Sequence, residues 1–93
     1  MSERKISDMY LAAALLSYGS NFIGVDRNEK QRQKFIFTGV VPNVVIAEED
    51  VNLRNIKDVP IEAFEVHYIA GRVWLPPSYP ASVKQIKSAI HSG

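Results

Sequence analysis

His67 and His91 are the side chains best suited to acid–base or metal chemistry in this sequence, and they are its only histidines. Neither belongs to an H-x-x-x-H or H-E-x-x-H pair, the spacing that places metal ligands on one face of a helix. We therefore interpret His67 as a surface or partly buried polar residue. His91 is interpreted as a residue near a helix C-terminus, where positive charge is mildly favourable.

The densest acidic run is Glu48-Glu49-Asp50, and three carboxylates are enough to hold a divalent cation. Adjacent residues do not converge in a helix, however, and an EF-hand loop needs alternating ligands around a central glycine. A solvated loop is the better interpretation of this run.

Other motifs of catalysis are missing from the sequence. It contains no cysteine, which excludes thiol nucleophiles, disulfides and cysteine-ligated metal clusters. The five glycines form neither a dinucleotide-binding fingerprint nor a phosphate-binding loop, and no serine occupies a G-x-S-x-G elbow. The sequence thus predicts no catalytic residue, no cofactor and no metal, and we expect a protein that is not an enzyme.

Charge is distributed unevenly along the chain, although the formal net charge is only +1. Residues 1–34 are net basic, residues 35–65 are net acidic, and residues 66–93 carry basic charge alone. If the basic residues share a face, they could bind phosphates while Trp74 stacks on a base. The candidate contacts for an anion or a nucleic acid are Arg27, Lys30, Arg32, Lys34, Arg72, Trp74, Lys84 and Lys87.

The isoelectric point, near 8.0, is lower than the value above 9 that is typical of nucleic-acid-binding domains. Oppositely charged segments on one small body equally favour self-association. We therefore favour a binding protein that acts through a protein partner or through a second copy of itself, and nucleic-acid binding is the alternative. The apolar run from Val40 to Ile46 predicts either an exposed strand available for pairing or a buried strand.

The clearest predicted element is a helix that begins after Ser7 as N-cap and runs to about Tyr18, where Gly19 stops it. Strands are predicted at 22–25 and 34–38, with the polar connection Asp26 to Gln33 between them.

The middle of the chain is more ambiguous. Residues 44–47 suit a short strand or a helical turn, and residues 48–56 suit a loop or a short helix. For residues 60–71 we favour a helix, capped by Asp58, over a hairpin that returns through 72–75. Residues 73–75 are predicted to be a strand in either case. The last helix should begin near Ser78, with an apolar stripe of Tyr79, Val83, Ile86 and Ile90.

These elements predict one α+β domain spanning residues 1–93. It is a small two-layer domain in which N-terminal and C-terminal helices pack on a short, mostly antiparallel sheet. The apolar run 9–16 is too short to cross a bilayer, so we expect no membrane partner. Because the sequence also has no cysteine, we expect a cytoplasmic protein.

The order of these segments resembles a small family of uncharacterised domains that occur in bacterial and phage genomes. The resemblance rests on the helix 7–15 ending at Gly19, on 23–26 and 35–37, and on the closing segment 71–90. It implies the fold and a phage or mobile-element setting. Because the family has no assigned activity, the resemblance implies no functional residue.

Overall fold

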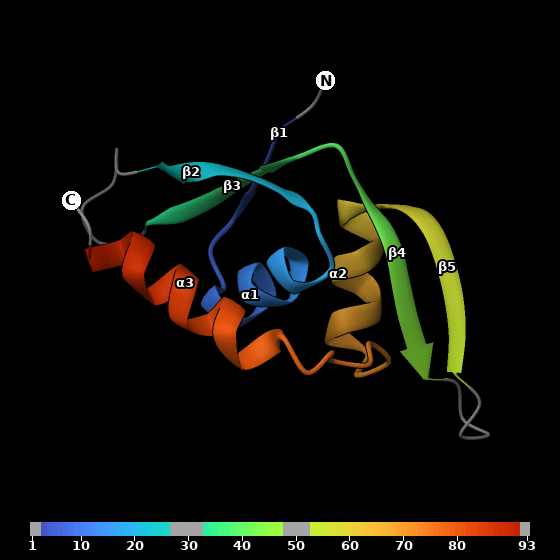
Figure 1. The fold of residues 1–93 in the computed structure, drawn as a ribbon. Helices are drawn as coiled ribbons and strands as arrows, with labels where there is room; N and C mark the ends of the chain where they lie inside the picture. Colours follow the sequence, from blue (N-terminus) through green and yellow to red (C-terminus); the bar gives the residue numbers. More distant parts are fainter. Residues whose placement is uncertain (1–2, 27–32, 48–52, 92–93) are drawn as a thin grey trace.

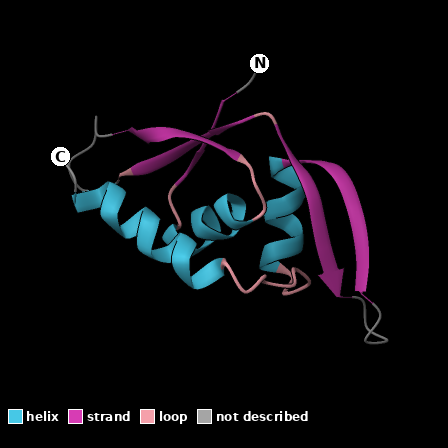
Figure 2. Ribbon diagram, viewed as in Figure 1, coloured by secondary structure: helices cyan, strands magenta, loops and turns pink. Residues whose placement is uncertain are grey.

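The structure is a computed structural model that describes residues 3–26, 33–47 and 53–91. Figure 1 shows two layers, with one sheet above the helices and a second, smaller sheet beside α2. Figure 2 shows the helices gathered on one face of the larger sheet. The elements are β1 (Glu3–Ile6), α1 (Met9–Ser17), β2 (Asn21–Asp26), β3 (Lys34–Thr38), β4 (Val40–Ala47), β5 (Leu53–Pro60), α2 (Ile61–Ile69) and α3 (Tyr79–His91). The predicted α+β class is confirmed.

The larger sheet has the strand order β1-β3-β2, and every pair is antiparallel. Phe35 and Phe37 lie on its inner face, as their period-two spacing predicts, and the Phe22 ring packs on both. Strand β1 was not predicted, because its sequence is mostly charged. It is held by its ladder with β3, by a salt bridge from Arg4 to Glu65 of α2, and by one from Lys5 to Asp26.

Helix α1 is the buried centre of the helical layer, and Gly19 ends it with φ +83° as predicted. The predicted cap is wrong by one residue. Asp8, not Ser7, is the N-cap, and its carboxylate accepts hydrogen bonds from the backbone N–H groups of Tyr10 and Leu11. The carboxylate can bond these groups and also carries the charge that the positive end of the helix favours.

Alanine substitution at each position distinguishes Asp8 from Ser7 as the N-cap of α1. Asp8→Ala should lower the free energy of unfolding by about 0.5 to 2 kcal/mol, because two backbone donors lose their acceptor. Ser7→Ala is the matched control and should change it by less than about 0.5 kcal/mol. Thermal or urea unfolding of both variants measures the difference. A larger loss for Ser7→Ala than for Asp8→Ala would contradict the observed cap.

Strands β4 and β5 form the second sheet, which has two strands. For residues 44–47 the strand prediction is confirmed, and the buried alternative holds for Val41, Val44 and Ile46. For residues 53–56 both predictions, loop and short helix, are wrong. Most side chains of β5 are exposed, so apolar alternation is weak there, and only the ladder with β4 defines this strand. The run Glu48 to Asp50 lies outside the described residues.

Helix α2 confirms the helical prediction for residues 61–69 over the hairpin. Ile61 and Phe64 are buried on the predicted face, and Gly71 follows with φ +74°. The predicted cap is wrong, because Asp58 lies in β5 with a left-handed φ of +52° and Pro60 occupies the N-cap position without a side-chain hydrogen bond.

Helix α3 packs against α1 along its apolar stripe, in which Ile86 is fully buried. The predicted strand at 73–75 is wrong as an element. Only Val73 makes a β-bridge, to Ile46, because Pro76 and Pro77 follow and proline has no N–H to extend a ladder. Within the described residues, no helix is both long and apolar enough to cross a membrane.

Candidate functional site

Among the predicted basic residues that the structure describes, Lys34 lies apart from the others. Arg27, Lys30 and Arg32 lie outside the described residues. Lys34 begins β3, is half-buried and lies opposite Asp26 in the ladder. Lys84 and Lys87 are exposed on α3, and Arg72 and Trp74 lie in the α2–α3 linker (residues 70–78). Figure 1 shows the start of β3 and this linker at different ends of the molecule, so Lys34 is not brought together with Trp74.

The backbone of the linker is fixed along the edge of β4. Ala47 donates its N–H to the carbonyl of Arg72 at 2.6 Å, and Trp74 donates its N–H to the carbonyl of Val45 at 2.9 Å. The Tyr18 hydroxyl, at the end of α1, donates to the carbonyl oxygens of Val45 and Trp74. Burial raises the pKa of Tyr18, so this donor stays protonated near neutral pH. The Trp74 side chain is therefore carried on an ordered backbone.

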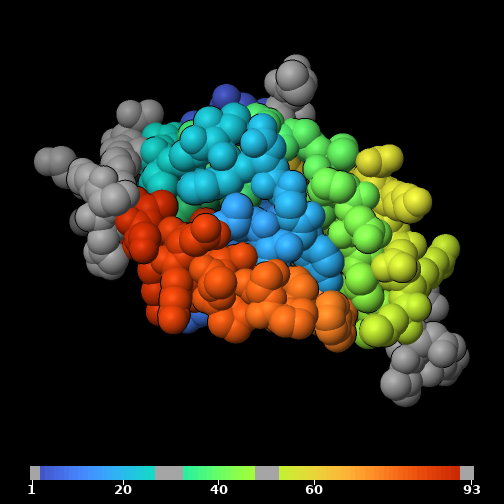
Figure 3. Space-filling view, in the orientation of Figure 1, coloured from blue at the N-terminus to red at the C-terminus, as the bar shows by residue number. Residues whose placement is uncertain are grey.

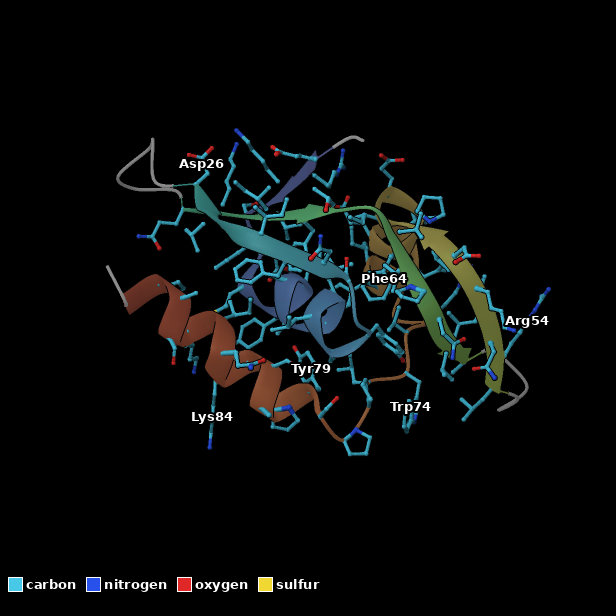
Figure 4. The ribbon with its side chains drawn as sticks, turned by 45° about the horizontal axis from the view of Figure 1, so that its top comes forward. Asp26, Arg54, Phe64, Trp74, Tyr79 and Lys84 are labelled. Atoms are coloured by element: carbon cyan, nitrogen blue, oxygen red, sulfur yellow. The ribbon has the colours of Figure 1, made fainter. Side chains whose placement is uncertain are left out.

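Trp74 itself points away from the core. Its side chain is 41% exposed, and Figure 4 shows it projecting from the body of the molecule, as Lys84 also does. Trp74 is the only tryptophan of the chain. Arg72 beside it is exposed, and among the described residues its side chain makes no hydrogen bond or ion pair.

Exposed apolar side chains are concentrated around this linker. Eight large apolar residues are exposed in the described part of the chain, and four of them lie between residues 66 and 75. Val66 and Ile69, on α2, are 64% and 81% exposed, and Trp74 and Leu75 follow them. We refer to residues 66–75 as the 66–75 segment. Only Arg72 and Trp74 of this segment were candidate contacts from the sequence, because no sequence pattern shows that Val66 and Ile69 are exposed on α2.

Tyr68 and Tyr79 lie near Tyr10 at the start of α1. This arrangement was not predicted from the sequence. Tyr68 of α2 and Tyr79 of α3 share a side-chain hydrogen bond, and the Tyr79 hydroxyl also donates to the Tyr10 carbonyl at 3.4 Å. Burial, the charge of Tyr68 and the nearby Asp8 carboxylate raise the pKa of Tyr79 to about 12. These hydroxyls connect three helices, which indicates a structural role.

The raised pKa makes this contact sensitive to alkaline pH. Tyr79 titrates at 10 when unfolded and at about 12 when folded, so its stabilising effect is complete below pH 10. That effect should be lost as the pH rises from 10 to 12. In this range the Tyr79 hydroxyl keeps its proton in the folded state but loses it in the unfolded state, so a higher pH favours unfolding. Unfolding curves across this range should show a steeper loss of stability for the wild type than for Tyr79→Phe. Parallel curves would contradict this role, since lysine titration affects both proteins equally.

Another polar site lies where β1 meets the start of α2. A cavity of about 170 Å³ is lined by Glu3, Arg4, Gly39, Val40, Pro60, Ile61 and Glu62. Its volume is below the range of about 300 to 1,000 Å³ for ordinary small-molecule pockets. Arg4 is already engaged, because Glu65 accepts two hydrogen bonds from its guanidinium and so raises its pKa.

His67 is half-buried on α2, and its Nδ1 atom is buried without a hydrogen-bond partner among the described residues. The His91 side chain lies outside the described part. In that part of the chain, no three carboxylate or imidazole side chains gather closely enough to hold a metal ion.

The chain shows no significant match to a known protein family, to a curated protein or to a solved structure. The resemblance to uncharacterised bacterial and phage domains therefore stays a prediction.

Proposed function

We propose that this chain is a non-enzymatic binding protein that docks onto a protein partner through the 66–75 segment. The observation that carries the proposal is the concentration of exposed Val66, Ile69, Trp74 and Leu75 in ten residues. Exposed large apolar side chains that gather in one region often mark interaction sites on soluble proteins. Tryptophan and arginine, here Trp74 and Arg72, are the residue types that contribute most to binding energy in protein interfaces.

The order of the backbone supports the same proposal. The main chain of Arg72 and Trp74 is bonded to β4, and the Tyr18 hydroxyl holds the Trp74 carbonyl. A side chain on a fixed backbone loses less conformational entropy when it binds than one on a mobile loop. The 66–75 segment thus combines exposed apolar side chains with a preorganised backbone.

Nucleic-acid binding is the alternative, and one observation favours it. Arg72, Lys84 and Lys87 are exposed, and Figure 4 shows Trp74 and Lys84 projecting from the same side in that view. Lys34 lies at the other end of the molecule, so few of the predicted phosphate contacts in the described part of the chain lie near Trp74. A surface with few cations binds nucleic acid weakly at physiological salt.

Fluorescence of Trp74 separates the two functions, because this chain has no other tryptophan. We expect a mixed-sequence oligonucleotide to leave the emission and the light-scattering mass unchanged at low salt. A complex that forms at low salt and weakens steeply as salt rises would instead favour nucleic-acid binding.

The protein-docking function is tested with a partner captured through a photo-crosslinker at Leu75 and then purified. Binding should shift the Trp74 emission to shorter wavelength as the indole leaves water. Trp74→Ala should raise the Kd at least about tenfold, which is about 1.4 kcal/mol. Lys87→Ala, exposed on α3, is the control and should leave the Kd unchanged. Equal Kd values for the wild type and Trp74→Ala would contradict docking through this segment.

A further inference from the structure

Strand β5 has an open edge. In the smaller sheet β4 pairs with β5 on one side, and the linker occupies the other side of β4 near Val45 and Ala47. The second edge of β5 meets no other strand among the described residues. Figure 1 shows β5 as the outermost element of this side of the molecule. An open edge is a template for one more strand.

The hydrogen bonds of β4 show which groups of β5 face that open edge. Val45 and Ala47 direct their bonded main-chain groups toward the linker. Because this direction alternates along a strand, the main-chain groups of Val44 and Ile46 point toward β5. Their ladder partners are Ile56 and Arg54, which therefore direct their main-chain groups toward β4. By the same alternation, the N–H and C=O groups of Leu53, Asn55 and Lys57 point to the open edge.

We propose that β5 pairs with β5 of a second copy, antiparallel about a two-fold axis, with Ile56 opposite Ile56. In this register Asn55 of each copy lies opposite Lys57 of the other, and both residues direct main-chain groups to the shared edge. Arg54 of each copy lies opposite Asp58 of the other, so the pairing creates two symmetric contacts between opposite charges. The inference uses a surface separate from the 66–75 segment and so goes beyond the proposed function.

The charges of β5 select this register. A two-fold axis normal to the sheet places the same face of both copies on the same side. Opposite residues of an antiparallel pair share a face, and along a strand the faces alternate. The axis must therefore pass through a residue and not between two residues. A centre at Asn55 places Arg54 opposite Ile56, and a centre at Lys57 places two lysines opposite each other. Only the centre at Ile56 sets Arg54 against Asp58.

Charged edge residues usually protect a strand from pairing, and β5 carries Arg54, Lys57 and Asp58. In the proposed register each of them meets a neutral or an oppositely charged residue, so the same charges exclude the other registers. Arg54 already takes part in an interaction within the chain, and its guanidinium has five N–H donors to share. Figure 4 shows Arg54 projecting outward from β5.

Asp58 limits the length of the pairing. Its φ of +52° interrupts the β4–β5 ladder, in which Asp58 has no partner. The pairing between copies therefore extends from Arg54 to Asp58.

The test is sedimentation of the full chain over a range of concentrations, with charge reversal at the two paired positions. The wild type should dimerise. Arg54→Asp and Asp58→Arg should each weaken the dimer at least about tenfold, because each places like charges opposite each other twice. The double variant restores both pairs and should recover the wild-type Kd to within about threefold. Lys87→Asp makes the same charge change on α3 and should leave the dimer unaffected.

A second variant tests the main-chain contact. Asn55→Pro removes an N–H that faces the open edge and should abolish the dimer, while far-ultraviolet circular dichroism shows that the chain remains folded. Trp74→Ala should leave the dimer intact, which separates this inference from the proposed function.

A wild-type chain that stays monomeric would overturn the inference. So would a dimer that neither charge reversal nor Asn55→Pro weakens, or a double variant that dimerises no better than the single variants.

Discussion

Replacing Phe64 with alanine should destabilise the chain by about 3 to 5 kcal/mol, the usual cost of removing a buried aromatic ring. Phe64 is fully buried on α2, and its ring meets Tyr18 edge to face at 5.9 Å. Figure 4 shows it between α2 and β4, so the ring joins the smaller sheet to the helical layer. A chain of this size is only about 5 to 15 kcal/mol stable, so the variant should lose a large part of its stability.

The measurement is the free energy of unfolding from urea titration. Val66→Ala is the matched control, because Val66 lies two residues along the same helix and is 64% exposed. The control should change the stability by less than about 0.5 kcal/mol. A similar small loss for Phe64→Ala would mean that α2 is not packed as described.

Ile86→Ala is expected to cost about 2 to 5 kcal/mol, because it leaves a cavity between α3 and α1. Ile86 is fully buried and is the most buried member of the apolar stripe of α3. The loss should appear in the same titration, with an unchanged dependence on urea if the two-state transition is retained.

Lys87→Ala is the control for Ile86→Ala, since it removes an exposed neighbour on the same helix. It should leave the free energy of unfolding within about 0.5 kcal/mol of the wild type. A loss below about 1 kcal/mol for Ile86→Ala would show that the last helix is not docked.

The helices were predictable because their own side chains carry the signal. The stripe through Val83, Ile86 and Ile90 and the stop at Gly19 are local patterns, and both are present in the structure. Each depends on residues within one or two turns of one another.

Strands β1 and β5 were not predictable in the same way. Glu3 to Lys5 are charged, and β5 buries few of its side chains. Their partners, β3 and β4, are apolar and supply the hydrogen bonds that define the strands. The opposite error occurred at 73–75, where an apolar triplet forms only one bridge before two prolines.

The candidate site shows the same division. Composition and motif spacing favoured a binding protein, and they identified Arg72 and Trp74 as candidate contacts for an anion or a nucleic acid. They did not indicate that Val66 and Ile69 would be exposed, nor that Lys34 would lie far from Trp74. They also missed the hydrogen bond between Tyr68 and Tyr79, which joins residues from two helices.

Local features of this protein, including its helix stripes, its glycine stops and its lack of cysteine, follow from the order of residues alone. The identity of the edge strands, the exposed face of α2 and the fixed backbone at Trp74 depend on packing between distant segments. The reason is physical: a helix satisfies its backbone hydrogen bonds within itself, whereas a strand and an exposed surface are defined by what lies beside them.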